Sequence, residues 1–146
     1  MANTPEENNR IAHLFFSSAW NKGEFHEEII SPDAIDYSTV GGKEGGRGPE
    51  SFRQVVNMFR SGMPDIHLNI EDEIYAGDKV VHRWTMTGTD TQGLMGMPPS
   101  GKYLTFTGMT IVRMEDGKIV ERWTNVDELG ILQQLGIVPP PPGAHE

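Results

Sequence analysis

The sequence predicts an α+β domain in which helices cover one face of a curled antiparallel sheet. Helical spacing of apolar residues dominates the first part of the chain, whereas alternation of apolar and polar residues dominates residues 66–126. Gly77-Asp78 and Asp116-Gly117 separate the alternating segments, as turns do in hairpins. The 146 residues suit one domain, expected over residues 1–138, followed by a proline-rich tail at 139–146.

Two longer helices are expected before the strands. Thr4-Pro5-Glu6-Glu7 is typical of a helix start, with Thr4 as the cap, and that helix should end between Trp20 and Gly23. A short helical piece at 25–30 and a strand at 34–39 should follow. The glycine-rich run 41–48 is expected to be a flexible loop that could act as a lid. Pro49 then begins a helix whose apolar residues share one face: Phe52, Val55, Val56 and Phe59.

Four long strands should form the rest of the sheet. In the first, Ile66, Leu68, Ile70 and Ile74 have the same parity and are expected on one face. In the second, Lys79 to Thr89, one face carries Val80, His82, Trp84 and Met86, and the other carries Val81, Thr85 and Thr87. Tyr103 to Met114 is the third strand. In the fourth, one face carries Ile119, Glu121, Trp123, Asn125 and Asp127, and a short helix ending at Gly136 follows.

Composition excludes several classes of function. The formal net charge is -9, and no Lys/Arg cluster is present, so neither nucleic acid nor an anionic membrane is expected as a partner. The chain has no cysteine, which excludes thiolate chemistry and disulfides. No signal peptide and no apolar run long enough to span a bilayer are visible, so a soluble cytoplasmic protein is expected.

The candidates for chemistry are carboxylates on strand faces. The five histidines are scattered without metal-ligand spacing, and no GxSxG elbow occurs. Asp127 stands where the last strand ends and the closing helix begins. It could cap that helix or, facing a pocket, take a proton from a carbon next to a carbonyl, and both roles remain open. Counting outward from the turn places Arg113 opposite Val120 or Glu121, which predicts an Arg113–Glu121 ion pair.

These features resemble one known family, the SnoaL-like polyketide (ester) cyclases of the nuclear-transport-factor-2-like superfamily. The resemblance extends from the first helix to Gly136, and it rests on motifs in a fixed order and spacing. They are Gly77-Asp78-Lys79-Val80-Val81, Gly88-Thr89, Gly96-Met97-Pro98-Pro99-Ser100-Gly101, Asp116-Gly117-Lys118-Ile119, and Trp123 with Asp127 and Gln134-Leu135-Gly136.

The resemblance implies a cone-shaped α+β barrel in which a curled sheet and helices enclose a pocket. It also implies an intramolecular aldol closure of a polyketide ester without metal or cofactor, with an aspartate as acid/base. The matching position is Asp127. Two residues depart from the family pattern: Asp90 stands where a histidine is frequent after Gly88-Thr89, and Arg113, not a histidine, is expected near the acid/base.

The sequence therefore predicts an enzyme that acts on a small hydrophobic molecule. Besides Asp127, the expected pocket residues are Trp123, Asn125, Arg113, Glu121, Trp84, Tyr37, Phe59 and Trp20. One alternative is a binding protein without a reaction, in which Asp127 is a cap. Others are the hydroxylase and hydrolase activities found among relatives. A homodimer or homotetramer is also expected, with Val81, Thr85 and Thr87 as an outer patch.

Overall fold

The computed structural model describes residues 3–38 and 45–143, so the first half of the glycine-rich run 41–48, with the lid predicted there, and the last three residues of the tail lie outside the described residues. Three α-helices lie within this part of the chain, together with a π-helical turn, a 3-10 turn and a five-stranded sheet. In chain order they are α1 (Pro5–Ser17), η1 (Ser18–Lys22), η2 (Glu27–Ile29), β1 (Ile30–Asp36), α2 (Gly48–Gly62), β2 (His67–Ala76), β3 (Lys79–Thr89), β4 (Tyr103–Glu115), β5 (Lys118–Val126) and α3 (Glu128–Gln134).

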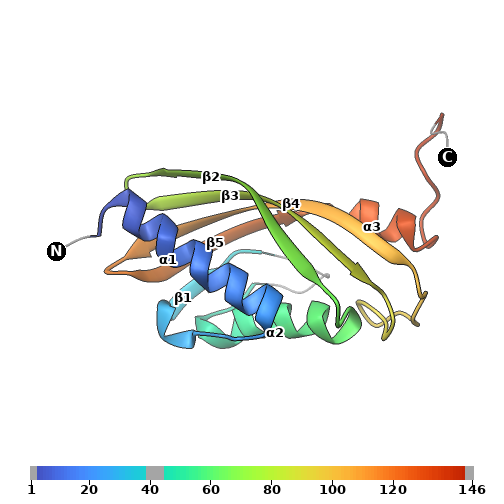
Figure 1. Cartoon of the computed structure of the whole chain (residues 1–146), viewed down its shortest axis with the longest axis horizontal. Helices are drawn as coiled ribbons and strands as arrows, with labels where there is room; N and C mark the ends of the chain where they lie inside the picture. Colours follow the sequence, from blue (N-terminus) through green and yellow to red (C-terminus); the bar gives the residue numbers. More distant parts are fainter. Residues whose placement is uncertain (1–2, 39–44, 144–146) are drawn as a thin grey trace.

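The sheet arches over α1 and α2, which lie on its concave side, while α3 lies beside the first part of β4 (Figure 1). The strand order is β1-β5-β4-β3-β2. Neighbours from β2 to β5 are antiparallel, but β1 pairs with β5 in parallel, so the expectation of a wholly antiparallel sheet is corrected to a mixed one. The reason is the long connection through α2, because only hairpin-linked neighbours must run in opposite directions.

Local signals explain where the elements begin and end. Thr4 caps α1 by accepting a hydrogen bond from the Glu7 backbone at 3.2 Å, as its sequence predicts. The helix widens into η1 and stops at Gly23, whose φ of 70° places it in the left-handed region that favours glycine. The first strand is Ile30–Asp36, earlier than the predicted 34–39, because the piece expected to be helical is only the short turn η2.

Two bulges change which side chains face inward. The pairing of β2 with β3 shifts between Ile70 and Asp72, and the pairing of β4 with β5 shifts at Val120. An extra residue in one strand turns every later side chain to the opposite face. Ile74 is therefore 63% exposed on the convex side, which corrects the expectation that it shares a face with Leu68.

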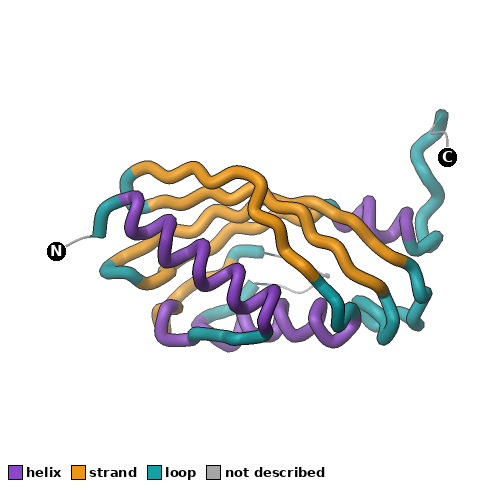
Figure 2. Tube along the Cα trace, viewed as in Figure 1, coloured by secondary structure: helices purple, strands orange, loops and turns teal. Residues whose placement is uncertain are grey.

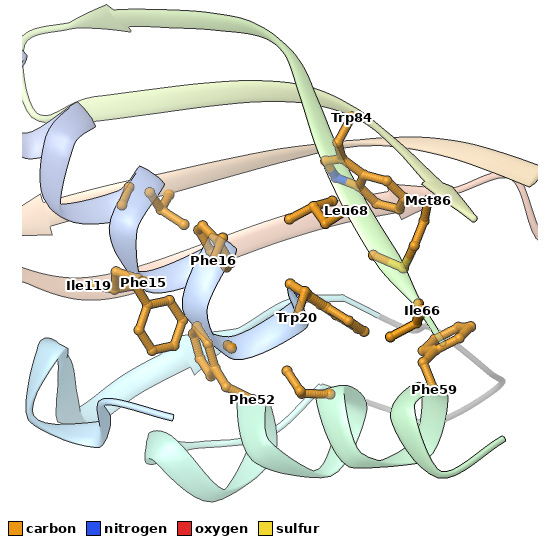
Figure 3. Packing of buried hydrophobic residues seen from close by; sticks show 14 of the residues in the cluster. Phe15, Phe16, Trp20, Phe52, Phe59, Ile66, Leu68, Trp84, Met86 and Ile119 are labelled. Atoms are coloured by element: carbon orange, nitrogen blue, oxygen red, sulfur yellow. The ribbon is translucent and has the colours of Figure 1, made fainter. Parts of the chain in front are cut away.

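The core fills the space between the concave side of the sheet and the helices. Trp84, Leu68 and Met86 descend from the sheet, and Trp20 lies between them and Phe59 of α2 (Figure 3). The same layers are visible along the Cα trace in Figure 2, where α1 and α2 underlie the strands. Burial of these large apolar side chains, each worth about 1.5–3 kcal/mol, holds the helices against the sheet.

Candidate functional site: a cavity under the sheet

A cavity lies inside this apolar layer. The cavity is small, with a volume of ≈ 40 Å³. The side chains around it come from the helical segments α1, η1 and α2 and from the four strands β2 to β5. They are mostly apolar with a few polar groups, as is usual for small-molecule sites. They are Phe16, Trp20, Val55, Phe59, Leu68, Ile70, His82, Trp84, Met86, Phe106, Thr110, Arg122, Thr124 and Val126.

Trp84 and two threonines form one polar group in the cavity wall. The Trp84 indole Nε1–H donates to Thr110 Oγ1 at 3.0 Å, and the hydroxyls of Thr110 and Thr124 lie 3.1 Å apart. Gly108 makes this possible, because it is paired with Trp84 and a Cβ built there would lie 2.3 Å from the indole ring. Glycine inside a strand often marks such a close approach. The cavity therefore offers hydroxyl donors beside an aromatic wall.

Arg122 is the cationic side chain among the cavity-lining residues. Its Nε donates to Asp36 Oδ1 at 3.2 Å and its Nη2 donates to Asp36 Oδ2, while the Phe52 ring lies 4.2 Å from the guanidinium carbon. Arg122 is 4% exposed and Asp36 is 3% exposed. Among the described residues, no hydrogen-bond acceptor is paired with Arg122 Nη1. A buried, fixed guanidinium of this kind can stabilise negative charge on an oxygen of a bound molecule.

His82 is the second ionisable side chain in the cavity wall. Its Nε2 lies 2.9 Å from Asn9 Oδ1 on α1, and the Asn9 amide donates to Glu73 Oε1 at 3.2 Å. His13 Nδ1 is 2.7 Å from the same Glu73 oxygen. Burial lowers the pKa of His82 to about 4, although the nearby Glu73 carboxylate acts in the opposite direction. His82 is therefore neutral near pH 7.

The structure divides the sequence-predicted pocket residues into two groups. Trp20, Phe59 and Trp84 line the cavity. Trp123 and Asn125, with Asp127, line an open hollow on the convex side of β3, β4 and β5. The physical reason is the bulge at Val120: Ile119 is fully buried inside, but the later residues of its parity face outward, and Arg122, Thr124 and Val126 face inward instead.

Asp127 occupies the cap position of α3. Its carboxylate accepts the Gly130 backbone N–H at 2.9 Å, its own backbone N–H donates to Thr107, and its side chain is exposed. The capping role that the sequence left open is therefore present in the structure. The catalytic role predicted for Asp127 would place the reaction in the outer hollow.

Tyr37, Glu121 and Arg113 form a cluster with Trp123 on the convex side. Arg113 Nε donates to Glu121 Oε1 at 2.5 Å, which confirms the ion pair predicted from the turn. The Tyr37 hydroxyl donates to Glu121 Oε2 at 3.0 Å, and its ring stacks on Trp123 at 5.2 Å between centroids. The Arg113 and Tyr37 hydrogen bonds lower the pKa of Glu121, and its carboxylate in turn raises the pKa of Tyr37. The polar groups of these side chains therefore form hydrogen bonds within the cluster on the convex side.

Asp90, the departure from the family pattern, organises the loop between β3 and β4. It is 1% exposed, and its carboxylate accepts the backbone N–H groups of Gly93 and Ser100 at 3.0 Å each and the Ser100 hydroxyl at 2.8 Å. Asp90 is not among the residues that line the cavity. The substitution therefore acts on the shape of this loop.

Sequence reasoning missed four polar residues of the cavity: Arg122, Thr110, Thr124 and His82. His82 shares a face with Trp84 in the sequence pattern, which was a usable signal. Gly108 in the middle of a strand was another, because it indicated close packing next to Trp84. The ion pair of Arg122 with Asp36 joins β5 to β1, and no local pattern reports that long-range pairing.

Comparisons with known proteins agree with this fold. The family model described as SnoaL-like polyketide cyclase matches residues 10–135. Nogalonic acid methyl ester cyclase of Streptomyces nogalater is 30% identical over 127 residues, which cover 82% of this chain and 90% of that protein. Aklanonic acid methyl ester cyclase DnrD of Streptomyces peucetius is 28% identical over 112 residues, covering 76% of this chain and 74% of that protein.

Solved structures give the same result. TsrD from Streptomyces laurentii superimposes with a TM-score of 0.81 at 25% identity, covering 93% of this chain and 99% of that one. AclR from Streptomyces galilaeus, described as a candidate hydroxylase, gives a TM-score of 0.82 at 25% identity, with coverage of 96% and 87%. Among the described residues, no helix has the length and apolar content that a bilayer span requires.

Proposed function

The chain belongs to the SnoaL-like polyketide cyclase family, and we propose that it closes a ring in a small polyketide-type ester bound in the cavity under the sheet. The substrate class follows from the relatives, which are named as cyclases of aklanonic and nogalonic acid methyl esters. A methyl ester carries no charge on its carboxyl group. It suits a cavity with aromatic walls and few polar groups.

The observation that carries the proposal is the guanidinium of Arg122, which is buried in an otherwise mostly apolar wall and held by Asp36. Ring closure at a carbon next to an ester carbonyl develops negative charge on a carbonyl oxygen. A fixed cation in a site that excludes water stabilises such charge more than solvent does. The hydroxyls of Thr110 and Thr124 are further donors on the same wall.

The proposed reaction is an intramolecular aldol addition. A base removes the proton from the carbon next to the ester carbonyl, and the electron pair of the C–H bond forms an enolate. The enolate carbon then bonds to a ketone carbon of the same molecule, and the ketone oxygen receives the proton. The product is an isomer of the substrate. Because only protons move and one carbon–carbon bond forms, the reaction calls for no metal or cofactor.

The position of the acid/base follows from where the substrate binds. The sequence places this role on Asp127, in the outer hollow with Trp123 and Asn125. That hollow is open, so water competes there with every polar contact to an enolate. We assign the chemistry to the enclosed cavity and give Asp127 the structural role of a helix cap. Substrate entry then requires lining side chains such as Trp20 and Phe59 to move, because the cavity volume of ≈ 40 Å³ is far below that of sites that hold a small organic molecule.

The test is incubation of the purified protein with aklanonic acid methyl ester and nogalonic acid methyl ester, followed by chromatography and mass spectrometry. We expect a new product of unchanged mass that has lost one ketone carbon signal in the NMR spectrum. Arg122→Gln should lose most of this turnover. Arg113→Gln, which alters the matching ion pair on the convex side, should keep it. Thermal denaturation of both variants checks that they are folded.

Four other outcomes would overturn the proposal. Binding of an ester without any product would indicate a binding protein. A product heavier by one oxygen atom would indicate a hydroxylase, and loss of the methyl ester would indicate a hydrolase. Equal turnover by wild type and Arg122→Gln would remove the cavity as the site.

A further inference from the structure

We propose that His82 is the acid/base of the ring closure, acting through its Nδ1, and that Asn9 and Glu73 are positioning residues that hold its proton on Nε2. This inference rests on the proposed function, since it assigns one step of that reaction to a residue of the same cavity. A chain of hydrogen bonds runs from the Glu73 carboxylate through Asn9 to His82.

The hydrogen bonds fix the tautomer of His82. The Glu73 carboxylate only accepts, so the Asn9 group that lies 3.2 Å from it must be the amide NH₂. The Asn9 carbonyl oxygen then faces His82 at 2.9 Å and can only accept. Nε2 of His82 must therefore carry the proton, and in the neutral ring Nδ1 is left as the bare nitrogen. The orientation of the Asn9 amide, set by Glu73, therefore determines which nitrogen of His82 is protonated.

The surroundings of His82 keep this nitrogen available. His82 is 3% exposed and lines the cavity, and no described residue forms a hydrogen bond with Nδ1. Phe16 packs against the edge of the ring, with the centroids 6.2 Å apart. The low pKa of His82, about 4 because of its burial, keeps the ring neutral and able to accept a proton near pH 7.

Charged groups face His82 from three directions. Glu73 on β2 lies 3.7 Å from Nε2 and favours the protonated ring. His13 on α1 disfavours it when charged. Arg122 lines the same cavity, and its charge is balanced by Asp36. The carboxylate of Glu73 is therefore placed to stabilise the imidazolium that forms when Nδ1 takes a proton.

His82 alone can take up and return the proton of this reaction. Nδ1 takes the proton from the carbon next to the ester carbonyl, and the electron pair of that C–H bond passes into the enolate. After the carbon–carbon bond forms, the ketone oxygen carries the negative charge and takes the proton back from Nδ1. His82 ends neutral, so each turnover leaves the enzyme unchanged.

The first experiment compares His82→Gln with His67→Gln, which replaces an exposed histidine at the start of β2. With aklanonic acid methyl ester as substrate, we expect His82→Gln to lose at least 100-fold in kcat, the usual scale for a general base, with little change in KM. His67→Gln should equal wild type. Full turnover by folded His82→Gln would overturn the assignment while leaving the cyclase function intact.

The second experiment tests the positioning residues by a pH profile. Asn9→Asp places a carboxylate beside Nε2–H, which favours the charged ring and raises the pKa of His82. The acid limb of kcat/KM should move from about pH 4 toward higher pH by at least one unit. Asn9→Ala should lower kcat because the tautomer is no longer fixed. A purely structural Asn9 would leave the position of the acid limb unchanged.

A third measurement does not need turnover. Imidazole ¹⁵N NMR of wild type at pH 7 should show a neutral His82 with the proton on Nε2, and added aklanonic acid methyl ester should shift the Nδ1 signal. A proton on Nδ1, or a bound ester that leaves Nδ1 unchanged, would overturn the inference. If wild type turned over neither ester, the proposed function would fail, whereas the NMR result would still decide whether Nδ1 faces the ligand.

Discussion

The two faces of the sheet carry the same kinds of side chain in opposite environments. On the concave face, Arg122 pairs with Asp36 beside Phe52, and both charges are almost fully buried. On the convex face, Arg113 pairs with Glu121 beside Tyr37, with side-chain exposures of 27% and 22%. Glu121 and Arg122 are adjacent in β5, so one step along the strand separates an exterior ion pair from an interior one.

This difference determines how strongly water screens each ion pair. A partly exposed pair is screened by water, and its contribution to stability is about 0–1 kcal/mol. A buried pair costs desolvation, and the loss of one partner leaves an uncompensated charge in an apolar layer. The inner arginine is therefore held in place by Asp36, and water would screen its interaction with a molecule in the cavity less than at the surface. The outer arginine is occupied by Glu115 and Glu121.

The largest expected effect comes from breaking the inner pair. Arg122→Met should lower the free energy of unfolding by about 3–5 kcal/mol, because Asp36 remains buried and charged. Arg113→Met is the matched change on the convex face and should cost at most about 1 kcal/mol. Urea denaturation at pH 7 measures both. Similar losses for the two variants would contradict the contrast between the faces.

The next effect is the acid sensitivity that His82 confers. Its pKa falls from 6.5 in the unfolded chain to about 4 in the folded one, so the unfolded chain binds more protons between these values. Stability should be complete above pH 6.5 and should fall by about 3 kcal/mol as the pH drops to about 4. Urea denaturation of His82→Gln across this range should show a much flatter decline.

His67→Gln is the control for this prediction, because its side chain is exposed. Partial burial raises the pKa of Glu73, but hydrogen bonds from His13 and Asn9 outweigh burial and leave it below the ordinary value of 4.5. The contribution of Glu73 is therefore lost at lower pH than most of the His82 contribution. A decline between pH 6.5 and 5 that is the same in wild type and His82→Gln would show that His82 is charged in the folded protein.

The convex face also carries a row of apolar side chains. Ile74, Val81, Ile111 and Trp123 are successive register partners across four strands, and Tyr37 stacks on the last of them. We propose that a second copy of the chain covers this apolar row, which the ion pairs Arg83–Asp72 and Arg113–Glu121 accompany on the same face. The row overlaps the predicted outer patch only at Val81.

Trp123→Ala should weaken such a dimer by about 2 kcal/mol, roughly 30-fold in its dissociation constant, as truncation of a central interface tryptophan does. Tyr103→Ala removes an aromatic ring that is 65% exposed but lies outside the row, and it should leave the dimer unchanged. Sedimentation velocity over a concentration series measures both. A wild type that stays monomeric at all concentrations would contradict the proposal.

Much of the fold could be predicted from the sequence because its signals are local. Glycine turns placed β2 to β5 correctly, and counting from Asp116-Gly117 gave the pairing of Arg113 with Glu121. Thr4 and Gly23 marked the two ends of the first helical segment. These signals depend only on residues a few positions apart, so tertiary packing elsewhere in the chain does not change them.

The lining of the cavity could not be predicted in the same way, because it depends on a single inserted residue. Val120 has ordinary strand character, and nothing in its neighbourhood marks it as a bulge. Counting through it as a regular position exchanges the two faces of β5, so Trp123 and Asn125 were expected inside and Arg122 outside. The pairing of Arg122 with Asp36 also requires the parallel placement of β1, which long-range packing decides.

The smallest expected effect on stability comes from Asp127, and its variants test directly whether the base lies in the cavity or in the outer hollow. Asp127→Ala should cost about 1 kcal/mol of stability by removing the α3 cap, whereas Asp127→Asn should cost little, because asparagine caps equally well. If the chemistry takes place in the cavity, both variants keep the kcat of wild type with aklanonic acid methyl ester. If Asp127→Asn instead retains stability and loses turnover, the base lies in the outer hollow, and the carboxylate that caps α3 also moves the proton. Asparagine separates these cases because it preserves the hydrogen bond to Gly130 while removing the basic oxygen.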